Sequence, residues 1–348
     1  MLYNMQAVIL AAGKSTRTYP LTLTKPKPLL KVANRTILEH NFENLTGIAD
    51  EIILIVGYKK EMIKKYFGKS CNNIPLRYIE QKEQLGTGHA ASLAEPYIQD
   101  KFILMAGDDI YSKEDIRNCI KCQYSIMTST AENPQNFGVV IEKNKVLLNF
   151  IEKPKKFVSN LVNTSFYQFD RKIFHHLEKI KKSRRNEFEL TDAVKLLSKN
   201  EKVRCIKARQ WLPIGYPWDL LKADRILRKN KNMIGENSKI YGKIKNSSIG
   251  DNCTIKGFVK NSIIMDNTTI DENSLAEDSV VGENVYFKGK IISNNPAISV
   301  VNGKKIKAGT LGAIVADNVK ADNVVINAGC KIWPSKIISN NIIRQDLM

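Results

Sequence analysis

The sequence predicts an α/β domain with a mixed, mostly parallel sheet, followed by a left-handed parallel β-helix of hexapeptide repeats. Two patterns predict this fold. Short apolar runs alternate with segments of helical periodicity up to about residue 230. After about residue 232, aliphatic residues return every six positions between turns rich in Gly, Asn and Asp. We expect two domains, over residues 1–231 and 232–348.

The first domain begins with a series of apolar runs that have the length of strands. These runs are AVILAA, EIILIVGY, PLRYIEQ and KFILMAGD. Between them, the spacing of apolar residues predicts helices over 59–67 and 88–99. Alternating strands and helices indicate a parallel sheet with helices on both faces. Ligands of such sheets bind beyond the carboxyl ends of the strands.

The remainder of the first domain is predicted to combine extended and helical segments. Residues 137–154 form two extended segments joined at Lys143–Lys145, and LVNTSFYQF is a further strand. Helical periodicity then returns near 171–182, 188–199 and 218–230. These segments complete the domain before the pattern changes.

The second domain is predicted from repeated nine-residue stretches such as IGENSKIYG, IGDNCTIKG and VGENVYFKG. In each copy an aliphatic or aromatic residue returns six positions after the first, so that stacked coils bury these side chains on one another. The pattern is lost around 288–310 and resumes at residue 311. The copies start at Ile234, Ile249, Ile264 and Val281, and the returning residues are Ile240, Ile255, Ile270 and Phe287.

Composition indicates the partners and the compartment. The net charge is +19, but the lysines are scattered and no RNA-binding signature is present, so we expect no nucleic acid partner. Six cysteines are too few for a disulfide scaffold and fit a reducing compartment. The first apolar run, of about six residues, is shorter than the roughly 20 that span a membrane. We expect a cytoplasmic protein with no membrane partner.

A phosphate-binding loop is indicated by LAAGKSTRTYPLTLTKPKPLL, which follows the first strand. A turn there presents backbone N–H groups to a phosphate, Gly13 permits close approach, and Lys14 and Arg17 add positive charge. A P-loop would need glycine at position 8, where the chain has Val8, and G-x-G-x-x-G is absent. Neither common nucleotide-binding motif therefore explains the stretch.

The segments LAAGKSTRTYP and PKPLL together resemble the signature of the sugar-1-phosphate nucleotidylyltransferases. The resemblance is strongest to N-acetylglucosamine-1-phosphate uridylyltransferases and glucose-1-phosphate thymidylyltransferase-like proteins of archaeal type. It implies a Rossmann-like nucleotidyltransferase domain whose loop and arginine bind a nucleoside triphosphate. Lys27 would contact phosphate at the reaction centre beside Arg17, with Lys25 as a second contact. The implied nucleotide-binding residues of the loop are Leu10, Ala11, Ala12, Gly13 and Lys14.

The stretch QKEQLGTGHA is similar to the segment with which these uridylyltransferases contact uracil. The similarity implies base contacts from Gln81, Gln84, Gly86 and Thr87. A glutamine amide both donates and accepts, which suits the imide edge of a pyrimidine. The alternative is a helix N-terminus with Gly and Thr as its cap.

Asp108, in the strand-terminating segment AGDD, matches the metal-binding aspartate of the family. The match implies Mg²⁺, which prefers carboxylate oxygens and substrate phosphates. Relatives often carry a second metal-binding aspartate in a W-x-D-x-G motif. This chain has Pro213 at that position, and its next aspartate is Asp219. Pro213 cannot bind a metal through its side chain.

The segments FGVV, IEKP and LVNTSFY resemble the parts of the family that bind the sugar 1-phosphate. The implied contacts come from Gly138, Glu152, Lys153 and Asn163. Glu152 would accept hydrogen bonds from sugar hydroxyls, and Lys153 would face the phosphate. EFELTD, over residues 187–192, also matches a family segment, without an implied contact.

Some relatives carry a second activity in the β-helix, acetyl transfer to an amino sugar phosphate with a histidine as general base. The four histidines of this chain are His40, His89, His175 and His176. None lies in the predicted β-helix, so its usual base is missing. We expect the β-helix to be structural and to assemble the chain as a trimer.

These observations predict an enzyme that makes UDP-N-acetylglucosamine, UDP-glucose or dTDP-glucose, together with pyrophosphate. The expected reaction is in-line attack of a sugar 1-phosphate on the α-phosphate of UTP or dTTP, assisted by Mg²⁺. Two alternatives remain open. One is a bifunctional uridylyltransferase and glucosamine-1-phosphate acetyltransferase. The other is a non-catalytic regulatory subunit with the same architecture.

Overall fold

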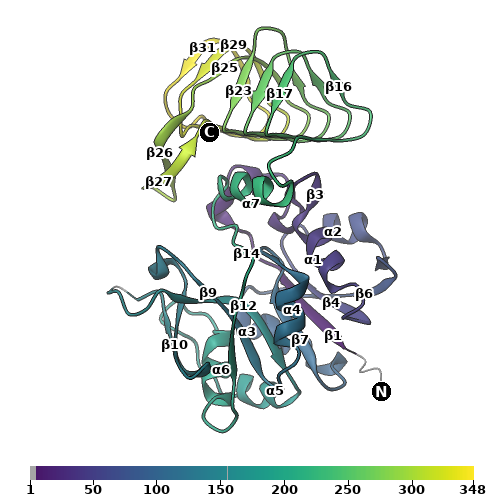
Figure 1. Ribbon diagram of the computed structural model, residues 1–348, viewed down its shortest axis with the longest axis vertical. Coiled ribbons are helices and arrows are strands. Elements are labelled where there is room, and N and C mark those ends of the chain that lie inside the picture. The colour runs from purple at the N-terminus through teal and green to yellow at the C-terminus, as the bar shows by residue number, and fades with distance from the viewer. Residues whose placement is uncertain (1–4, 155) are drawn as a thin grey trace. The chain divides into compact units, whose positions relative to one another are not determined.

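The computed structural model describes residues 5–154 and 156–348 and divides into two compact units (Figure 1). The first unit comprises the residues up to Gly13 together with Leu38–Pro213, and the second comprises Lys14–Ile37 together with Ile214–Met348. Residues 14–37 and 214–231 therefore belong to the same compact unit as the C-terminal coils. The predicted domain boundary after residue 231 stays a prediction.

The first unit is built on a ten-stranded mixed sheet in the order β10-β11-β13-β9-β12-β7-β1-β4-β6-β5. The strands β7, β1, β4 and β6 are parallel neighbours, whereas β12 runs antiparallel to β7 and β9. Antiparallel pairing extends further than the sequence indicated, because β10 and β11 form a hairpin at one edge. The strands are β1 (Gln6–Ala11), β4 (Glu51–Val56), β5 (Ser70–Cys71), β6 (Ile74–Glu80), β7 (Phe102–Ala106), β9 (Ser125–Thr130), β10 (Gly138–Lys143), β11 (Val146–Glu152), β12 (Leu161–Phe169) and β13 (Arg204–Lys207).

The helices of this unit are shorter than the periodic segments that predicted them. The segment 88–99 forms α3 only as far as Ser92, and a 3₁₀ turn follows in which Pro96 lacks the N–H that an α-helix requires. A short antiparallel pair, β8 (Ile110–Tyr111) with β14 (Trp211–Leu212), lies outside the main sheet. The helices are α1 (Ile37–Leu45), whose first residue falls in the second unit, α2 (Lys60–Phe67), α3 (Thr87–Ser92), α4 (Lys113–Cys119), α5 (Lys172–Leu177) and α6 (Leu190–Leu197).

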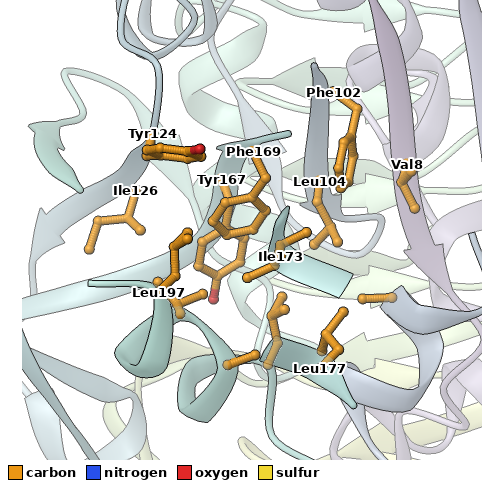
Figure 2. Close-up of a cluster of buried hydrophobic side chains, with 14 of the residues drawn as sticks. Val8, Phe102, Leu104, Tyr124, Ile126, Tyr167, Phe169, Ile173, Leu177 and Leu197 are labelled. Atoms are coloured by element: carbon orange, nitrogen blue, oxygen red, sulfur yellow. The ribbon is translucent and has the colours of Figure 1, made fainter. Parts of the chain in front are cut away.

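The main hydrophobic core of the first unit lies between the sheet and helices α3, α5 and α6 (Figure 2). The buried strands are continuous apolar runs because both faces of a parallel sheet are covered. Phe102 of β7 stacks on Phe174 of α5, with ring centroids 5.5 Å apart. Burial of each such side chain contributes about 1.5–3 kcal/mol. This core supports the strand ends that carry the candidate site.

The second unit contains a parallel β-helix, consistent with the left-handed form that the sequence predicted. The starts of the predicted copies pair in register from coil to coil, Ile234 with Ile249, Ile249 with Ile264, and Ile264 with Val281. Their side chains in the later coils are fully buried in a continuous core. The strands are β15 (Met233–Ile234), β16 (Lys239–Ile240), β17 (Lys243–Lys245), β18 (Ser248–Ile249), β19 (Thr254–Ile255), β20 (Phe258–Lys260), β21 (Ile263–Ile264), β22 (Thr269–Ile270), β23 (Leu275–Glu277), β24 (Val280–Val281), β25 (Tyr286–Ile291), β28 (Ile314–Val315), β29 (Lys320–Ile326), β30 (Lys331–Ile332) and β31 (Ile337–Ile343).

An antiparallel hairpin interrupts the coils where the sequence pattern is lost. It consists of β26 (Asn294–Val301) and β27 (Lys304–Leu311), joined through Asn302 and Gly303, which both have positive φ. The coils resume at β28, which pairs directly with β24. The loss of period in the sequence therefore marks an inserted hairpin within an otherwise continuous stack.

Residues 14–37 of the second unit form three 3₁₀ turns and a short hairpin of β2 (Lys31–Val32) and β3 (Arg35–Thr36). Helix α7 (Asp219–Leu227) connects this segment to the coils through Asp224. The carboxylate of Asp224 accepts hydrogen bonds from the Ala33 N–H and the Ser248 hydroxyl, and it forms a buried ion pair with Arg228. Among the described residues, no helix has the length and apolar character needed to cross a membrane.

Candidate active site

The nucleotide-binding residues predicted in the first unit lie where β1 ends. The carbonyl oxygen of Leu10 accepts a hydrogen bond from the Gly107 N–H, and that of Ala12 accepts one from Gln84 Nε2 at 2.9 Å. A Cβ atom at Gly57 would lie 2.9 Å from the Ala12 oxygen. The end of β1, at Ala11 and Ala12, is therefore packed against neighbouring backbone, whereas Gly13 is exposed, and glycine is required at position 57, where the two segments approach one another.

The two glutamines of the base segment are oriented by the backbone around them. Gln81 is buried, and its Nε2 donates to the carbonyl oxygen of Gly86 at 3.1 Å, while Gln84 donates to Ala12. In the part of the chain that the structure describes, neither amide oxygen accepts a hydrogen bond. The structure thus joins the predicted base segment to the predicted nucleotide loop. It also confirms the helix N-terminus, because α3 starts at Thr87 after Gly86.

The segment EFELTD shapes this base segment, a role that the sequence did not indicate. The Gly88 N–H donates to the Phe188 carbonyl, and the Phe188 N–H donates to the Leu85 carbonyl at 2.7 Å. A Cβ at Gly86, whose φ is +105°, would lie 2.6 Å from the Phe188 oxygen. Thr87 accepts the Leu190 N–H through its hydroxyl. Phe188 therefore holds the backbone that carries Gly86 and Thr87.

The predicted sugar-binding residues come together on β10, β11 and β12. Gly138 pairs with Glu152 in the β10–β11 register, and a Cβ at Gly138 would lie 3.1 Å from Glu152 Oε2 and 3.9 Å from Asn163 Cβ. Asn163 donates to the hydroxyl of Tyr167 at 2.6 Å. Lys153 follows with a positive φ of 41°, which is strained for a residue with a side chain.

Arg185 is a further charged group at this cluster, and the sequence did not single it out. Its guanidinium binds Glu189 through three hydrogen bonds of 2.8, 2.9 and 3.2 Å, and Nη2 lies 3.4 Å from Glu152. Burial raises the pKa of the Glu152 carboxyl, while the charges of Arg185 and Lys153 act in the opposite direction. A contact between a strand end and a distant loop has no local pattern, so the sequence could not reveal it.

Of the two aspartates that follow β7, Asp108 is the candidate for the metal. Asp109 Oδ2 accepts a hydrogen bond from Trp211 Nε1 at 3.1 Å, and its carbonyl accepts one from Asn41. Across residues 5–154 and 156–348, no group of three His, Cys, Asp or Glu side chains could hold a metal ion by itself. One carboxylate completed by water and substrate phosphates suits Mg²⁺. Asp108 fits that arrangement.

In the second unit, the exposed residue Arg17 lies beside the loop that precedes α7. Its guanidinium is 5.8 Å from the centre of the Tyr216 ring, which stacks on Trp218. A Cβ at Gly215 would lie 3.4 Å from Asp219 Oδ2 and 4.0 Å from Arg17 Nη1. Arg17 and Asp219 are therefore close to each other at the Gly215 turn.

The carboxylate of Asp219 is hydrogen-bonded to this turn, and it interacts with the charge of Lys27, one of the two cations predicted at the reaction centre. Its Oδ2 accepts hydrogen bonds from the N–H groups of Gly215 and Tyr216 at 2.8 and 2.7 Å. Burial raises the pKa of the Asp219 carboxyl, and these two N–H groups and the charge of Lys27 oppose that shift.

Lys25 is placed differently from the expectation, because its ammonium group forms ion pairs with Glu283 and Asp317. Lys14 precedes Ser15, which has a positive φ of 51°.

Comparison with known families identifies the class of protein. The family model described as Nucleotidyl transferase matches residues 6–230, and that of the GMPPB C-terminal domain matches residues 224–348. The chain therefore belongs to the nucleotidyl transferase family and is a transferase enzyme. Within that family it groups with the sugar-1-phosphate nucleotidylyltransferases, as its motifs predicted.

Individual relatives support this placement. The chain is 42% identical to the Bifunctional protein GlmU of Methanocaldococcus jannaschii over 247 residues, which cover 69% of the chain and 60% of that protein. It is 35% identical to the Bifunctional protein GlmU of Methanococcus maripaludis over 97% of the chain and 94% of that protein. It is also 35% identical to the UTP–glucose-1-phosphate uridylyltransferase AglF of Haloferax volcanii, over 67% of the chain and all of that protein.

Among solved structures, a putative glucose-1-phosphate thymidylyltransferase from Bacillus anthracis is similar, with a TM-score of 0.59 and 26% identity. The similarity covers 65% of this chain and 96% of that chain. The β-helix, predicted over residues 232–348, makes up much less than 65% of the chain. The similarity must therefore include residues of the α/β part, and it supports the fold of that part.

Proposed function

We propose that the chain forms a nucleotide sugar and pyrophosphate from UTP or dTTP and a sugar 1-phosphate. The observation that carries this proposal is the hydrogen bond from Gln84 to Ala12, which joins the base segment to the nucleotide loop. The cluster of Gly138, Glu152 and Asn163 supplies the corresponding groups for a sugar. The candidate products are UDP-N-acetylglucosamine, UDP-glucose and dTDP-glucose. They differ only in the base and the sugar, the groups that the base segment and this cluster would contact.

The proposed reaction is an in-line displacement at the α-phosphorus. A phosphate oxygen of the sugar 1-phosphate forms a bond to that phosphorus while the bond to the bridging oxygen breaks, and pyrophosphate leaves with its electron pair. The attacking oxygen is already anionic, so the chain need not supply a strong base. Arg17 and Lys27 would neutralise the charge that develops on the phosphates. When bound, Mg²⁺ would add positive charge there, with Asp108 as its protein ligand.

The orientation of the glutamine amides favours a pyrimidine. Because the Nε2 atoms of Gln81 and Gln84 donate to backbone carbonyls, their amide oxygens would accept the N3–H of uracil or thymine. Both bases share that imide edge, and one methyl group is discriminated weakly. We propose UTP as the preferred nucleotide and dTTP as the next.

The sugar cluster would read hydroxyl groups and the phosphate by different side chains. Glu152 and Asn163 would contact the sugar, and Lys153 would face its phosphate. Arg185, within 3.4 Å of Glu152, would hold that carboxylate in place. The candidates are N-acetylglucosamine 1-phosphate and glucose 1-phosphate. We further propose a cytoplasmic homotrimer assembled through the β-helix, with no nucleic acid or membrane partner.

Pyrophosphate release from the purified protein with Mg²⁺ tests the proposal. UTP, dTTP, ATP and GTP are each combined with N-acetylglucosamine 1-phosphate and glucose 1-phosphate. Release confined to pyrimidine triphosphates is expected, and the most active pair identifies the product. If the folded protein releases pyrophosphate from no pair, the proposal is wrong, and the non-catalytic subunit takes its place.

A second candidate function is acetyl transfer by the β-helix. The observation in its favour is the match to a bifunctional relative over 97% of the chain. That match extends over 391 residues, more than the 348 of this chain, so the relative has segments that this chain lacks. No histidine follows His176. Consumption of acetyl-CoA with glucosamine 1-phosphate would establish this activity, and we expect none.

A further inference from the structure

One corner of the β-helix carries a column of acidic side chains from successive coils. In each turn an acidic residue precedes a residue of positive φ, Asn in all of these coils. The carboxylate of each aspartate in the column accepts the N–H of the acidic residue on the coil before it. Asp251 accepts from Glu236 at 2.8 Å, and Asp266 accepts from Asp251 at 3.0 Å. The acidic column consists of Glu236, Asp251, Asp266, Glu283 and Asp317.

Glycine stands in the turn wherever the next coil sends a carboxylate into it. A Cβ at Gly235 would lie 2.3 Å from Asp251 Oδ1, and one at Gly250 would lie 2.4 Å from Asp266 Oδ1. Gly282 has the same relation to Asp317, also at 2.4 Å. The G-[D/E]-N turns of the sequence are therefore a consequence of the column. They fix one oxygen of each aspartate and leave the second to face outward.

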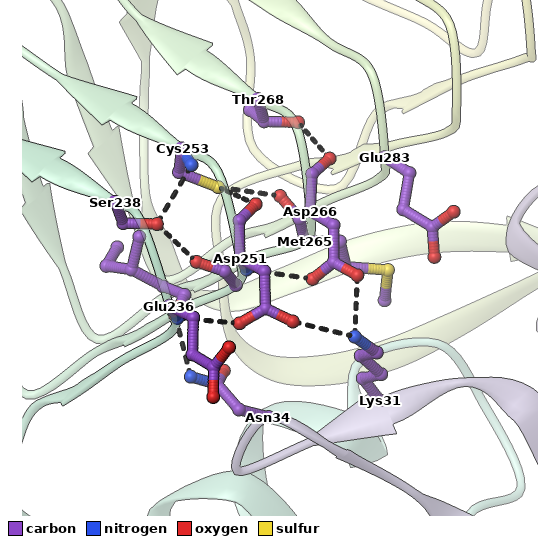
Figure 3. Close-up of polar contacts among 12 residues, drawn as sticks. Lys31, Asn34, Glu236, Ser238, Asp251, Cys253, Met265, Asp266, Thr268 and Glu283 are labelled. Atoms are coloured by element: carbon purple, nitrogen blue, oxygen red, sulfur yellow. Dashed lines mark hydrogen bonds and ion pairs between the residues drawn. The ribbon is translucent and has the colours of Figure 1, made fainter.

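The outward oxygens of the column bind two lysines of the segment that follows the phosphate-binding loop. Lys31 Nζ lies 2.6 Å from Asp266 Oδ2 and 3.8 Å from Asp251 Oδ2 (Figure 3). Lys25 forms ion pairs with Asp317, at 3.1 Å, and with Glu283. Each lysine is thus held between two coils.

The Lys25–Asp317 and Lys31–Asp266 ion pairs are largely withdrawn from water. The side chains of Lys25 and Asp317 are each 6% exposed, and those of Lys31 and Asp266 are 15% and 19% exposed. The hydroxyl of Thr24 adds a hydrogen bond of 2.6 Å to Asp317 Oδ2. Removing both carboxylates that pair with one lysine would leave its ammonium group buried without compensation, so the geometry at each lysine is strongly constrained.

Lys27 lies between the two anchored lysines on a stiff piece of backbone. It starts the 3₁₀ turn Lys27–Leu29 and stands between Pro26 and Pro28, whose rings restrict φ. The Leu30 N–H donates to the Lys27 carbonyl at 2.9 Å, which closes the turn. A displacement of either anchor would therefore be transmitted to Lys27 and would not be absorbed by a flexible linker.

We propose that the acidic column of the β-helix is the positioning device for Lys27. Glu283 and Asp317 hold the segment on one side through Lys25, and Asp266 holds it on the other through Lys31. These acids are positioning residues, since they act on the substrate only through the lysine segment. The inference rests on the role of Lys27 in the proposed function, and it assigns the β-helix a part in nucleotidyl transfer.

The test compares the full-length wild type with the variant E283Q/D317N, which removes both partners of Lys25. We expect kcat for pyrophosphate release to fall by about 10- to 100-fold, the cost of a misplaced group, with KM for the sugar 1-phosphate nearly unchanged. A purely structural role would lower stability and leave kcat per folded molecule intact. The matched control is Asp271→Asn, a coil aspartate that binds Lys256 and Tyr286 instead.

A second readout does not depend on activity. Amide hydrogen exchange of residues 20–31, measured without substrate, should become at least about 10-fold faster in E283Q/D317N and remain unchanged in Asp271→Asn. If the double variant does not fold, Asp266→Asn is measured in the same way. Adding Lys25→Met to the double variant removes the unpaired charge. We expect stability to recover while kcat stays low.

The outcomes separate this inference from the proposed function. Normal kcat and normal exchange in the column variants, with Lys27→Ala inactive, would overturn the positioning role and keep the reaction. If the wild type releases no pyrophosphate, the proposed function is wrong. Hydrogen exchange then remains as the one test of whether the acidic column holds the lysine segment. Unchanged exchange of residues 20–31 would then overturn the inference, and faster exchange would support it.

Discussion

Gln84 donates a hydrogen bond of 2.9 Å to the carbonyl oxygen of Ala12, across 72 residues of sequence. The contact joins the segment proposed to read the base to the loop proposed to bind the triphosphate. It also orients the amide, because the nitrogen donates to the backbone and the oxygen is left to accept a hydrogen bond from the base. The following expectations depend on this and on comparable contacts.

Replacement of Gln84 by Ala should raise KM for UTP by about 5-fold, which corresponds to the loss of roughly 1 kcal/mol of hydrogen bonding. The melting temperature should change little, because the Ala12 carbonyl still accepts the N–H of Tyr58. Steady-state kinetics and thermal unfolding measure the two effects. Gln123→Ala, at an exposed position, is the control. An unaltered KM would remove Gln84 from the base site.

Replacement of Lys27 by Ala should lower kcat by at least about 10²-fold, the typical effect of deleting a group that stabilises transition-state charge. The fold should persist, because the 3₁₀ turn is closed by backbone hydrogen bonds. Lys288→Ala, on the β-helix surface, controls for a change of net charge. Normal turnover by Lys27→Ala would show that the reaction centre lies elsewhere.

Asp108→Asn should raise the Mg²⁺ concentration needed for half-maximal activity by about 10-fold or more, since metal affinity depends strongly on a direct carboxylate ligand. Chelation should abolish activity in the wild type. Asp109→Asn is the matched control. It should weaken the hydrogen bond to Trp211 and lower stability without changing the Mg²⁺ requirement. Equal requirements in all three proteins would exclude Asp108 as the ligand.

Glu152→Gln should become more stable relative to the wild type as the pH rises. Burial raises the pKa of Glu152 above its ordinary value of 4.5, so the folded state favours the protonated carboxyl. Its contribution to stability is complete below the unfolded pKa and is lost as the pH rises through the folded pKa. The amide carries no such dependence. Melting temperatures between about pH 4 and pH 8 should reveal a growing difference.

The same substitution should reduce kcat/KM for the sugar 1-phosphate, because the amide replaces a charged acceptor for sugar hydroxyls. A stability difference that is independent of pH would contradict the raised pKa. An unchanged kcat/KM would contradict the sugar contact. Asp192→Asn offers a comparison, since burial also raises the pKa of that carboxyl.

Asp224→Ala should lower the free energy of unfolding by about 3–5 kcal/mol, because it leaves the buried guanidinium of Arg228 without its partner. Both side chains are only 2% exposed. Glu114→Gln is the control, since its ion pair with Arg209 is exposed and should contribute less than about 1 kcal/mol. Chemical denaturation measures both. Similar losses in the two variants would contradict the dominance of burial.

The sequence predicted those parts of the fold that depend on local periodicity. The continuous apolar runs of β1, β4 and β7 can be recognised in a single sequence. The same is true of the coil positions Ile249 and Ile264, which recur at equivalent places in the repeat. The predicted positions of helix ends were less accurate. Helix α3 ends before Pro96 although the apolar spacing continues, because proline lacks the N–H that the helix would need there. The hairpin of β26 and β27 appeared only as a gap in the repeat.

Contacts between distant segments could not be predicted in the same way. Phe188 supports Gly86, and Arg185 lies beside Glu152, but neither pair has a local signature. The ion pairs of Lys25 have no local signature either. A lysine beside Lys27 suggests a phosphate contact, whereas its partners Glu283 and Asp317 belong to coils near the end of the chain.

That separation has a consequence for the order in which the chain matures. Thr24 and Lys25 leave the ribosome early, but their partner Asp317 is translated 293 residues after Thr24. At about 5–20 residues per second, the delay is on the order of 15–60 s. Throughout that time Thr24 and Lys25 lack the carboxylate of Asp317, and the second unit of the nascent chain is incomplete. Synthesis of the last coils is thus the step that commits the segment to its native conformation.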